Sequence, residues 1–127
     1  MANTSARRTT IRIEKAAERV IKRLAFGVHS KIVVATPVDT GWARANWIPS
    51  IGRPVEKAAG SREAVGAARG AQSAGVARLL IYDLSQGDIW ISNNVPYIER
   101  LNQGSSPQAD ARFVERAIEA GIRSVRG

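Results

Sequence analysis

The side chains that could do chemistry in this chain are few and widely spaced. The 127 residues contain one histidine, His29, and no cysteine. The lack of cysteine removes disulfides and thiolate metal sites, and one histidine does not form a zinc cluster alone. Gly66, Gly70 and Gly75 are too dispersed for a phosphate-binding loop and lack the Lys-Ser or Lys-Thr that completes one. We therefore expect a structural role for His29, no enzymatic activity, no metal and no cofactor.

The triplet Asp39-Thr40-Gly41 also occurs in aspartic proteases. Those enzymes need two such carboxylates sharing a proton, whereas this chain has one triplet and lacks the apolar strand that normally leads into it. Pro37 instead predicts the end of a helix, because it biases the residue before it away from helical geometry. Asp39 can accept hydrogen bonds from amides two and three residues on, and Gly41 supplies freedom in φ. We interpret Asp39 and Gly41 as structural turn residues.

Basic residues give the chain a formal charge of +8, from 19 Lys and Arg against 11 Asp and Glu. The excess lies mainly in residues 1–35, where eight basic and two acidic residues give +6. A charge of this sign invites an anionic partner, most often nucleic acid. At about 100° per residue, six of these side chains share one helical face: Arg8, Arg12, Lys15, Arg19, Lys22 and Arg23.

This basic face has three interpretations. It lies against DNA, where each Lys or Arg neutralises a phosphate; it contacts an acidic neighbouring protein; or it is a solvated helix surface. No zinc finger, aromatic RNA-binding motif or helix-turn-helix pattern accompanies it. A small basic nucleic-acid-binding protein is therefore the alternative function that composition alone supports.

Apolar periodicity predicts one long helix over residues 10–35, capped by Thr9 or Thr10. Its predicted core stripe is Ile13, Ala17, Val20, Leu24 and Val28. Residues 42–52 alternate in part and predict a strand. Three large side chains in and around it either pack in the core or form a subunit interface: Trp42, Arg44 and Trp47.

Residues 55–73 are rich in Ala, Gly and Ser and predict a flexible loop or a frayed helix inside a single domain of residues 1–127. Residues 74–84 are more helical in pattern, and residues 88–92 alternate as a strand does. There is no run of 18 apolar residues for a membrane span. The first residues lack the apolar core of a secretory signal.

The stretch after residue 92 predicts a device for fixing geometry. Asn93 and Asn94 tolerate a turn, and Pro96 suits the first turn of a short helix. Tyr97 and Leu101 are four residues apart, so they share a face that should anchor this helix. Gly104 stands where the helix would stop.

A final helix follows, with Asp110 as a cap or first-turn acid and Gly121 weakening its last turns. Its predicted buried stripe is Phe113, Ala117, Ile118 and Ile122. Together the elements predict an α+β fold. The first and last helices would pack on a small, mostly antiparallel sheet containing residues 44–51 and 88–92.

The order of these motifs resembles the tail-completion proteins of tailed bacteriophages, also called head–tail joining, neck or minor tail component proteins. The resemblance covers residues 36–47 and 86–118 and the pattern of the first helix. The residues that carry it are Thr36-Pro37-Val38-Asp39-Thr40-Gly41 with Arg44, Gly87-Asp88 before a strand, Asn93-Asn94-Val95-Pro96-Tyr97-Ile98 running to Leu101 and Gly104, Gln108-Ala109, and Phe113-Val114.

The resemblance implies a structural virion protein, assembled in the host cytoplasm and located at the head–tail junction or tail terminus. It implies a ring of identical subunits, for which we expect a hexamer, through which genomic DNA passes. Its partners would be the neighbouring connector and tail-tube proteins, with non-specific DNA contact, and it implies no catalysis. In such a ring the basic face would line the DNA channel or meet an acidic neighbouring ring.

Overall fold

The computed structural model describes residues 2–104 and 111–126, with side chains described over 13–104 and 111–125. Its elements are α1 (Ala2–Ala35), α2 (Trp42–Ala45), β1 (Ile48–Ile51), α3 (Val65–Leu80), the 3-10 turn η1 (Leu84–Gln86), β2 (Ile89–Ser92), α4 (Ile98–Asn102) and α5 (Phe113–Arg126). The fold is α+β, as predicted, with long N-terminal and C-terminal helices around a small antiparallel sheet.

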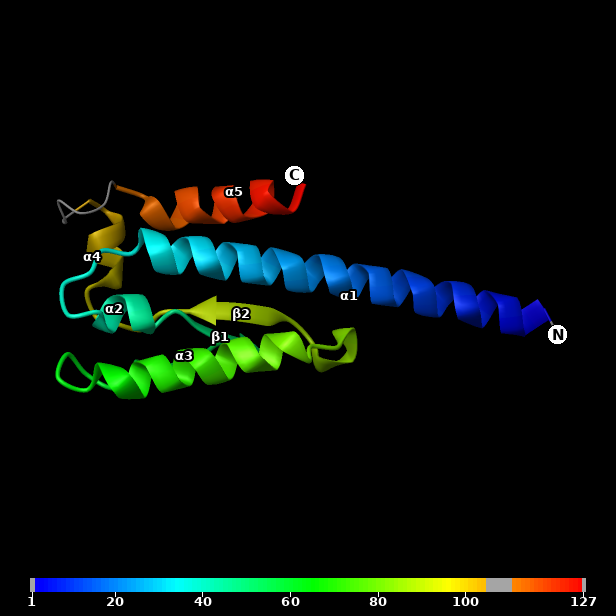
Figure 1. The fold of residues 1–127 in the computed structure, drawn as a ribbon, viewed down its shortest axis with the longest axis horizontal. Coiled ribbons are helices and arrows are strands. Elements are labelled where there is room, and N and C mark those ends of the chain that lie inside the picture. The colour runs from blue at the N-terminus through cyan, green and yellow to red at the C-terminus, as the bar shows by residue number, and fades with distance from the viewer. Residues whose placement is uncertain (1, 105–110, 127) are drawn as a thin grey trace.

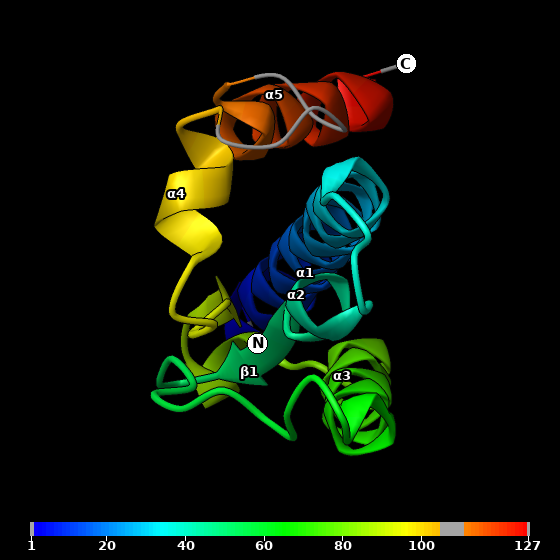
Figure 2. The ribbon, with the colours of Figure 1, turned by 90° about the vertical axis from the view of Figure 1, so that its left-hand side faces the viewer.

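The sheet lies between two layers of helix (Figure 1). Its two strands pair antiparallel, with Ile48 opposite Ser92 and Ile51 opposite Ile89. On one side α1 runs past the sheet with α5 antiparallel beside it, and on the other side α3 packs on β1 (Figure 1). The short helix α4 joins the level of the sheet to α5 (Figure 2).

Glycines allow α5 to approach α1 closely, and α3 to approach β1 closely. A methyl group built on Gly121 of α5 would lie 2.6 Å from the Cα atom of Val28, and one on Gly27 of α1 would lie 2.9 Å from Ser124 Oγ. A methyl group on Gly75 of α3 would overlap the carbonyl oxygen of Pro49 in β1. Gly121, which we expected to weaken α5, is therefore the residue that lets α5 lie against α1.

The buried face of α1 differs from the predicted stripe. The side chains that it buries are Glu18, Ala25, His29 and Ile32, and the buried Thr36 follows the helix. Ile13 and Val20 are 65% and 54% exposed, so their assignment to the core was wrong. The reason is one of position: Ile13 precedes Glu18, the first described side chain of α1 that bonds another element, and Val20 lies between Glu18 and Lys22 but on a side of the helix that stays exposed. Apolar periodicity there does not report burial.

The main core cluster joins α1 and α5 to Trp47, the residue that precedes β1. Ile32, Trp47 and Ala117 form its centre, and partly buried residues pack around it: Val28, Val33, Ala35, Ile91, Ile98 and Val114. In α5, Phe113 and Ala117 are buried as predicted, but Ile118 and Ile122 are each 37% exposed, which corrects the predicted stripe. Asp110, the predicted cap, lies outside the described residues.

Several predicted boundaries shift. α1 begins at Ala2, eight residues before the predicted start. The strand predicted within 44–51 is shorter, because Trp42–Ala45 form a helical turn and β1 begins at Ile48. The segment 55–73 is helical in its second half, since α3 begins at Val65 and ends at Leu80. The strand predicted at 88–92 is confirmed as β2.

Candidate interaction surface

A buried chain of hydrogen bonds holds the end of α1 against β1. The Trp47 indole N–H donates to Thr36 Oγ1 at 2.7 Å, and Thr36 Oγ1 donates to the Ile32 carbonyl at 2.6 Å. His29 Nε2 lies 2.9 Å from the Trp47 carbonyl, so Nε2 carries the proton and donates. Burial lowers the pKa of His29, although the bond to the Trp47 carbonyl acts in the opposite direction. His29 is therefore a neutral framework residue at pH 7, as predicted.

Arg44 closes the C-terminal end of α1. Its Nη2 donates to the carbonyls of Val34 at 3.1 Å and Thr36 at 3.0 Å, and its Nε donates to Thr36 at 3.2 Å. A cation at this position satisfies carbonyls that the helix leaves unpaired and complements its dipole. Gln72 of α3 then donates to the carbonyls of Arg44 and Trp47, both at 3.1 Å. Trp47 is only 7% exposed, so it packs in the core of the subunit, and Arg44 serves α1.

Trp42, the third residue of that interface hypothesis, holds a loop. Its indole N–H donates to the Ala59 carbonyl at 2.8 Å. The buried Asn46 brackets the same residue: its Nδ2 donates to the Ala59 carbonyl at 3.1 Å, and the Ala59 amide donates to its Oδ1 at 2.8 Å. Asn94 Nδ2 donates to the Val55 carbonyl at 2.7 Å. The first half of the segment expected to be flexible is thus tied to the body of the fold.

The turn after Pro37 uses Thr40 in place of Asp39. Thr40 Oγ1 accepts the amide of Trp42 at 3.2 Å. Asp39 is exposed, and in the described part of the chain no hydrogen bond to its carboxylate is found. Gly41 has φ +89°, the left-handed conformation expected there. The prediction that Asp39 accepts the turn amides was therefore wrong.

The stretch around Pro96 does fix the connection between the sheet and α5. Asn93 Nδ2 donates to the Ala43 carbonyl at 2.8 Å, and Asn93 Oδ1 accepts the amide of Val95 at 3.1 Å. Val95 is the buried anchor at 2% exposure, whereas Tyr97 and Leu101 are only half-buried. Sequence reasoning missed Val95 because it followed the helical spacing and not the extended residue before it. Gly104 has φ +98° and ends α4 as predicted.

Two further contacts complete this region. The Tyr97 ring lies 6.0 Å from the Trp42 ring, and the Arg62 guanidinium lies 5.1 Å from the Tyr97 centroid. Asn102 at the end of α4 donates to both carboxylate oxygens of Glu115, at 3.0 and 3.1 Å, and accepts the amide of Val114 at 2.9 Å. Two hydrogen bonds to the Glu115 carboxylate lower its pKa: the larger effect comes from the backbone amide of Glu115, and the smaller one from the Asn102 side chain.

The basic face of α1 is only partly free. Lys15, Arg19 and Arg23 are exposed, and Lys15 Nζ lies 3.5 Å from the carboxylate of the buried Glu18. Lys22 is half-buried and donates to the Leu80 carbonyl at 3.2 Å, at the C-terminal end of α3. Lys22 therefore ties α3 to α1. The side chains of Arg8 and Arg12, which were also assigned to this face, lie outside the described ones.

The N-terminal part of α1 extends beyond every other element drawn in Figure 1. Glu18 is the first of the described side chains along α1 that bonds another part of the fold. The amide of Leu84 donates to Glu18 Oε1 at 3.2 Å. We call residues 2–17 of α1 the arm. A helix of this length spans roughly 24 Å. The arm carries the exposed Ile13, and the exposed Val20 follows two turns after Ile13, just beyond the arm.

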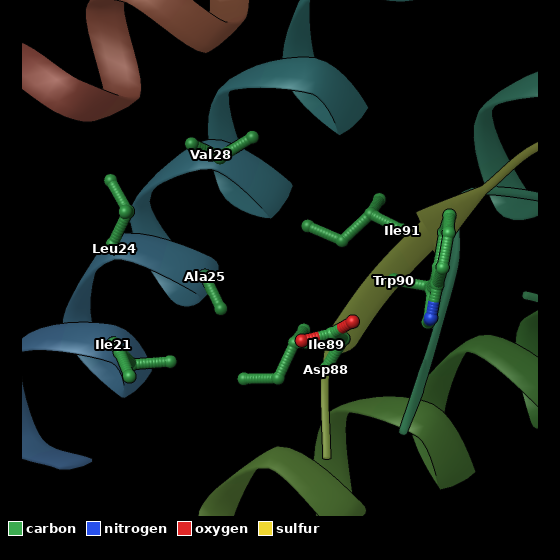
Figure 3. Close-up of a pocket in the computed structure, with 8 residues that line it drawn as sticks. All are labelled: Ile21, Leu24, Ala25, Val28, Asp88, Ile89, Trp90 and Ile91. Atoms are coloured by element: carbon green, nitrogen blue, oxygen red, sulfur yellow. The ribbon is translucent and has the colours of Figure 1, made fainter. Parts of the chain in front are cut away.

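An apolar groove of about 460 Å³ lies between α1 and β2. Its lining residues are Ile21, Leu24, Ala25, Val28, Asp88, Ile89, Trp90 and Ile91. Ile89 and Ile91 point from the strand toward α1, and Trp90 lies on the other side of the strand (Figure 3). Of the described residues that line this groove, only Asp88 is charged. No pattern in the sequence predicts this groove, because α1 and β2 meet only in the folded chain.

No family model, no curated protein and no solved structure matches this chain. In the described part of the chain, no helix is long and apolar enough to cross a membrane. The same residues contain no group of three His, Cys, Asp or Glu side chains placed to hold a metal ion. The surfaces that remain for function are the arm, the basic face and the groove.

Proposed function

We propose that this chain is a structural subunit of a tailed bacteriophage, which assembles with copies of itself into a ring at the head–tail junction or tail terminus. The first support is the order and spacing of the motifs that resemble the tail-completion family. The second is the use of the polar side chains. His29, Thr36 and Asn46 are buried and bonded to the backbone or to another framework side chain, as expected in a protein that acts by shape.

The arm is the observation that carries this proposal. Ile13 is 65% exposed and Val20 is 54% exposed on a helix that extends past the rest of the fold (Figure 1). Helices in water owe most of their stability to packing of an apolar face. A lone subunit leaves this face bare, and an assembly would cover it. Exposed apolar surface of this kind marks protein–protein contact.

Two measurements test the proposal. Light scattering coupled to size-exclusion chromatography of the purified protein should give a mass that is a multiple of 13.7 kDa, with six subunits as the expected number, and electron microscopy should show rings. Mass spectrometry of purified phage particles should detect the chain. A protein that stays monomeric at high concentration and is absent from particles would contradict the proposal.

A second candidate function, a small basic nucleic-acid-binding protein, is favoured by the exposed Lys15, Arg19 and Arg23 on one face of α1. In this case a monomer would bind duplex DNA with an affinity that falls steeply with salt. Charge reversal of these three residues to Glu should abolish binding. Reversal of Arg69, Arg78 and Arg100, which are also exposed, is the matched control. A monomer without salt-dependent DNA binding would exclude this candidate.

A further inference from the structure

Each copy of the chain carries an apolar arm and an apolar groove at separate places. We propose that the arm of one copy docks in the groove between α1 and β2 of the next copy, head to tail. This inference rests on the proposed ring assembly and gives that assembly its contact. The occupant of the groove is thus a second copy of this chain, and the docked segment is residues 2–17 with the turn that follows.

The apolar surfaces match in kind. Ile13, Ala17 and Val20 recur at four and three residues, which places them on one side of α1. Ile13 and Val20 are more than half exposed, and Figure 1 shows that α5 ends before it reaches this part of α1. The groove presents Ile21 from α1, and Ile89 and Ile91 from β2 point toward that helix (Figure 3). Docking would therefore cover apolar surface on both copies.

The lengths also match. The groove runs along residues 88–91, the last three of which belong to β2, or roughly 13 Å at about 3.3 Å per residue. On α1 it runs from Ile21 to Val28, a rise of about 10 Å. The arm, at roughly 24 Å, is long enough to fill the groove and still reach back to its own subunit.

Charge favours docking of an arm in a groove over packing of two arms against each other. The arm holds four basic residues and one acidic residue, so two arms packed on each other would bring like charges together. The groove offers Asp88, the one charged residue among the described residues that line it. The charge of the arm is therefore opposite to that of Asp88 and the same as that of another arm.

Such a contact has a direct consequence for the assembly. When the arm of one copy binds the groove of the next, and its own groove receives the arm of a third copy, the interface is heterologous and closes into a ring or continues as a filament. A symmetric pairing of arms would stop at a dimer. Each subunit would then contribute one arm and one groove, and the contact would be repeated around the ring.

The absence of cysteine from the sequence allows a sharp test by cross-linking. Ile13→Cys in the arm and Ile89→Cys in the groove are made separately, and each is treated with a short bifunctional thiol reagent. We expect a covalent dimer only when the two variants are mixed, and a covalent ladder when both substitutions are in one chain. Val34→Cys is the control, since Val34 is 70% exposed at the other end of α1 and should cross-link to neither.

A charge exchange adds a second readout. Asp88→Lys should weaken self-association by roughly 3- to 10-fold, and Lys15→Glu in the same chain should restore much of it. Cross-linking of Ile13→Cys to itself would overturn the inference in favour of paired arms. Oligomers in which positions 13 and 89 never cross-link would overturn it and leave the ring proposal standing. Monomers throughout would remove the ring proposal as well.

Discussion

Gly121 of α5 lies directly against the backbone of Val28 in α1, so close that a methyl group on Gly121 would lie 2.6 Å from Val28 Cα. The two helices approach closely at this point because Gly121 has no side chain to separate the backbone of α5 from that of α1. The C-terminal helix is therefore positioned by the absence of a side chain, and that relationship gives the first prediction.

Gly121→Ala should destabilise the protein by about 1–3 kcal/mol, because overpacking forces the backbones apart. Gly70→Ala is the matched control, since Gly70 also lies inside a helix and has no atom within 4 Å of an added methyl group. That substitution should stabilise by about 0.5–1 kcal/mol through the lower entropy of the unfolded chain. Urea unfolding of both variants measures the difference, and equal effects would contradict the close approach.

Thr36→Val should cost about 1–3 kcal/mol, because it leaves the buried Trp47 indole N–H without its acceptor. The donor and acceptor are 2.7 Å apart in a buried site, so water does not replace the lost bond. Thr36→Ser keeps the hydroxyl and should cost only about 1 kcal/mol for its missing methyl. If the Val variant proved as stable as the Ser variant in urea unfolding, this bond would not support the end of α1.

Stability should fall between pH 6.5 and more acidic values because of His29. Burial lowers its pKa in the folded state below the ordinary 6.5, so the unfolded chain takes up a proton that folded His29 resists. The contribution of neutral His29 is complete above pH 6.5 and is lost as pH falls toward the lowered folded pKa. Urea unfolding at about pH 7.5 and pH 5.5 measures this loss.

His29→Gln is the control for that titration, because its amide can still donate to the Trp47 carbonyl but does not titrate. Its stability should be nearly constant over the same window. Asp83 and Glu115 have lowered pKa values and ordinary values of 3.8 and 4.5, so their contributions are lost only at more acidic pH. A variant with the same pH dependence as the wild type would show that His29 is not the titrating group.

Asp39→Ala should change the unfolding free energy by less than about 0.5 kcal/mol, because its side chain is exposed and Thr40 accepts the turn amide. Gly41→Ala should cost about 1–2 kcal/mol, since φ is +89° there. Thermal unfolding of the two variants gives the comparison. A large loss of unfolding free energy in Asp39→Ala would show that the Asp39 carboxylate does stabilise the turn.

Local patterns in the sequence predicted the long helices, the second strand and two glycine turns, but not the helical turn α2 or the capping box of η1. Alternation predicted β2, the proline at position 96 predicted the start of α4, and the left-handed glycines at 41 and 104 were expected from turn chemistry. These features depend on residues only a few positions apart, so the local sequence is enough to predict them. The α+β class followed from the same order of elements.

Burial was the property that sequence pattern alone predicted least well. Ile13 and Val20 have the same spacing as the core residues of a helix, yet they are 65% and 54% exposed. Glu18 is charged and would be placed outside by type, yet it is buried where Leu84 supplies an amide. Periodicity shows which residues share a face, and only packing shows whether that face has a neighbour.

The candidate surface belongs almost wholly to tertiary structure. The sequence determined that the first helix is long, amphipathic and basic, and that the chain has no cysteine and a single histidine. The folded chain decided that Lys22 bonds α3, that Trp47 is core, and that Ile21 and Ile89, 68 positions apart, line one groove. The physical reason is that a groove is formed by residues distant in sequence, and their meeting depends on the whole set of helix and strand contacts.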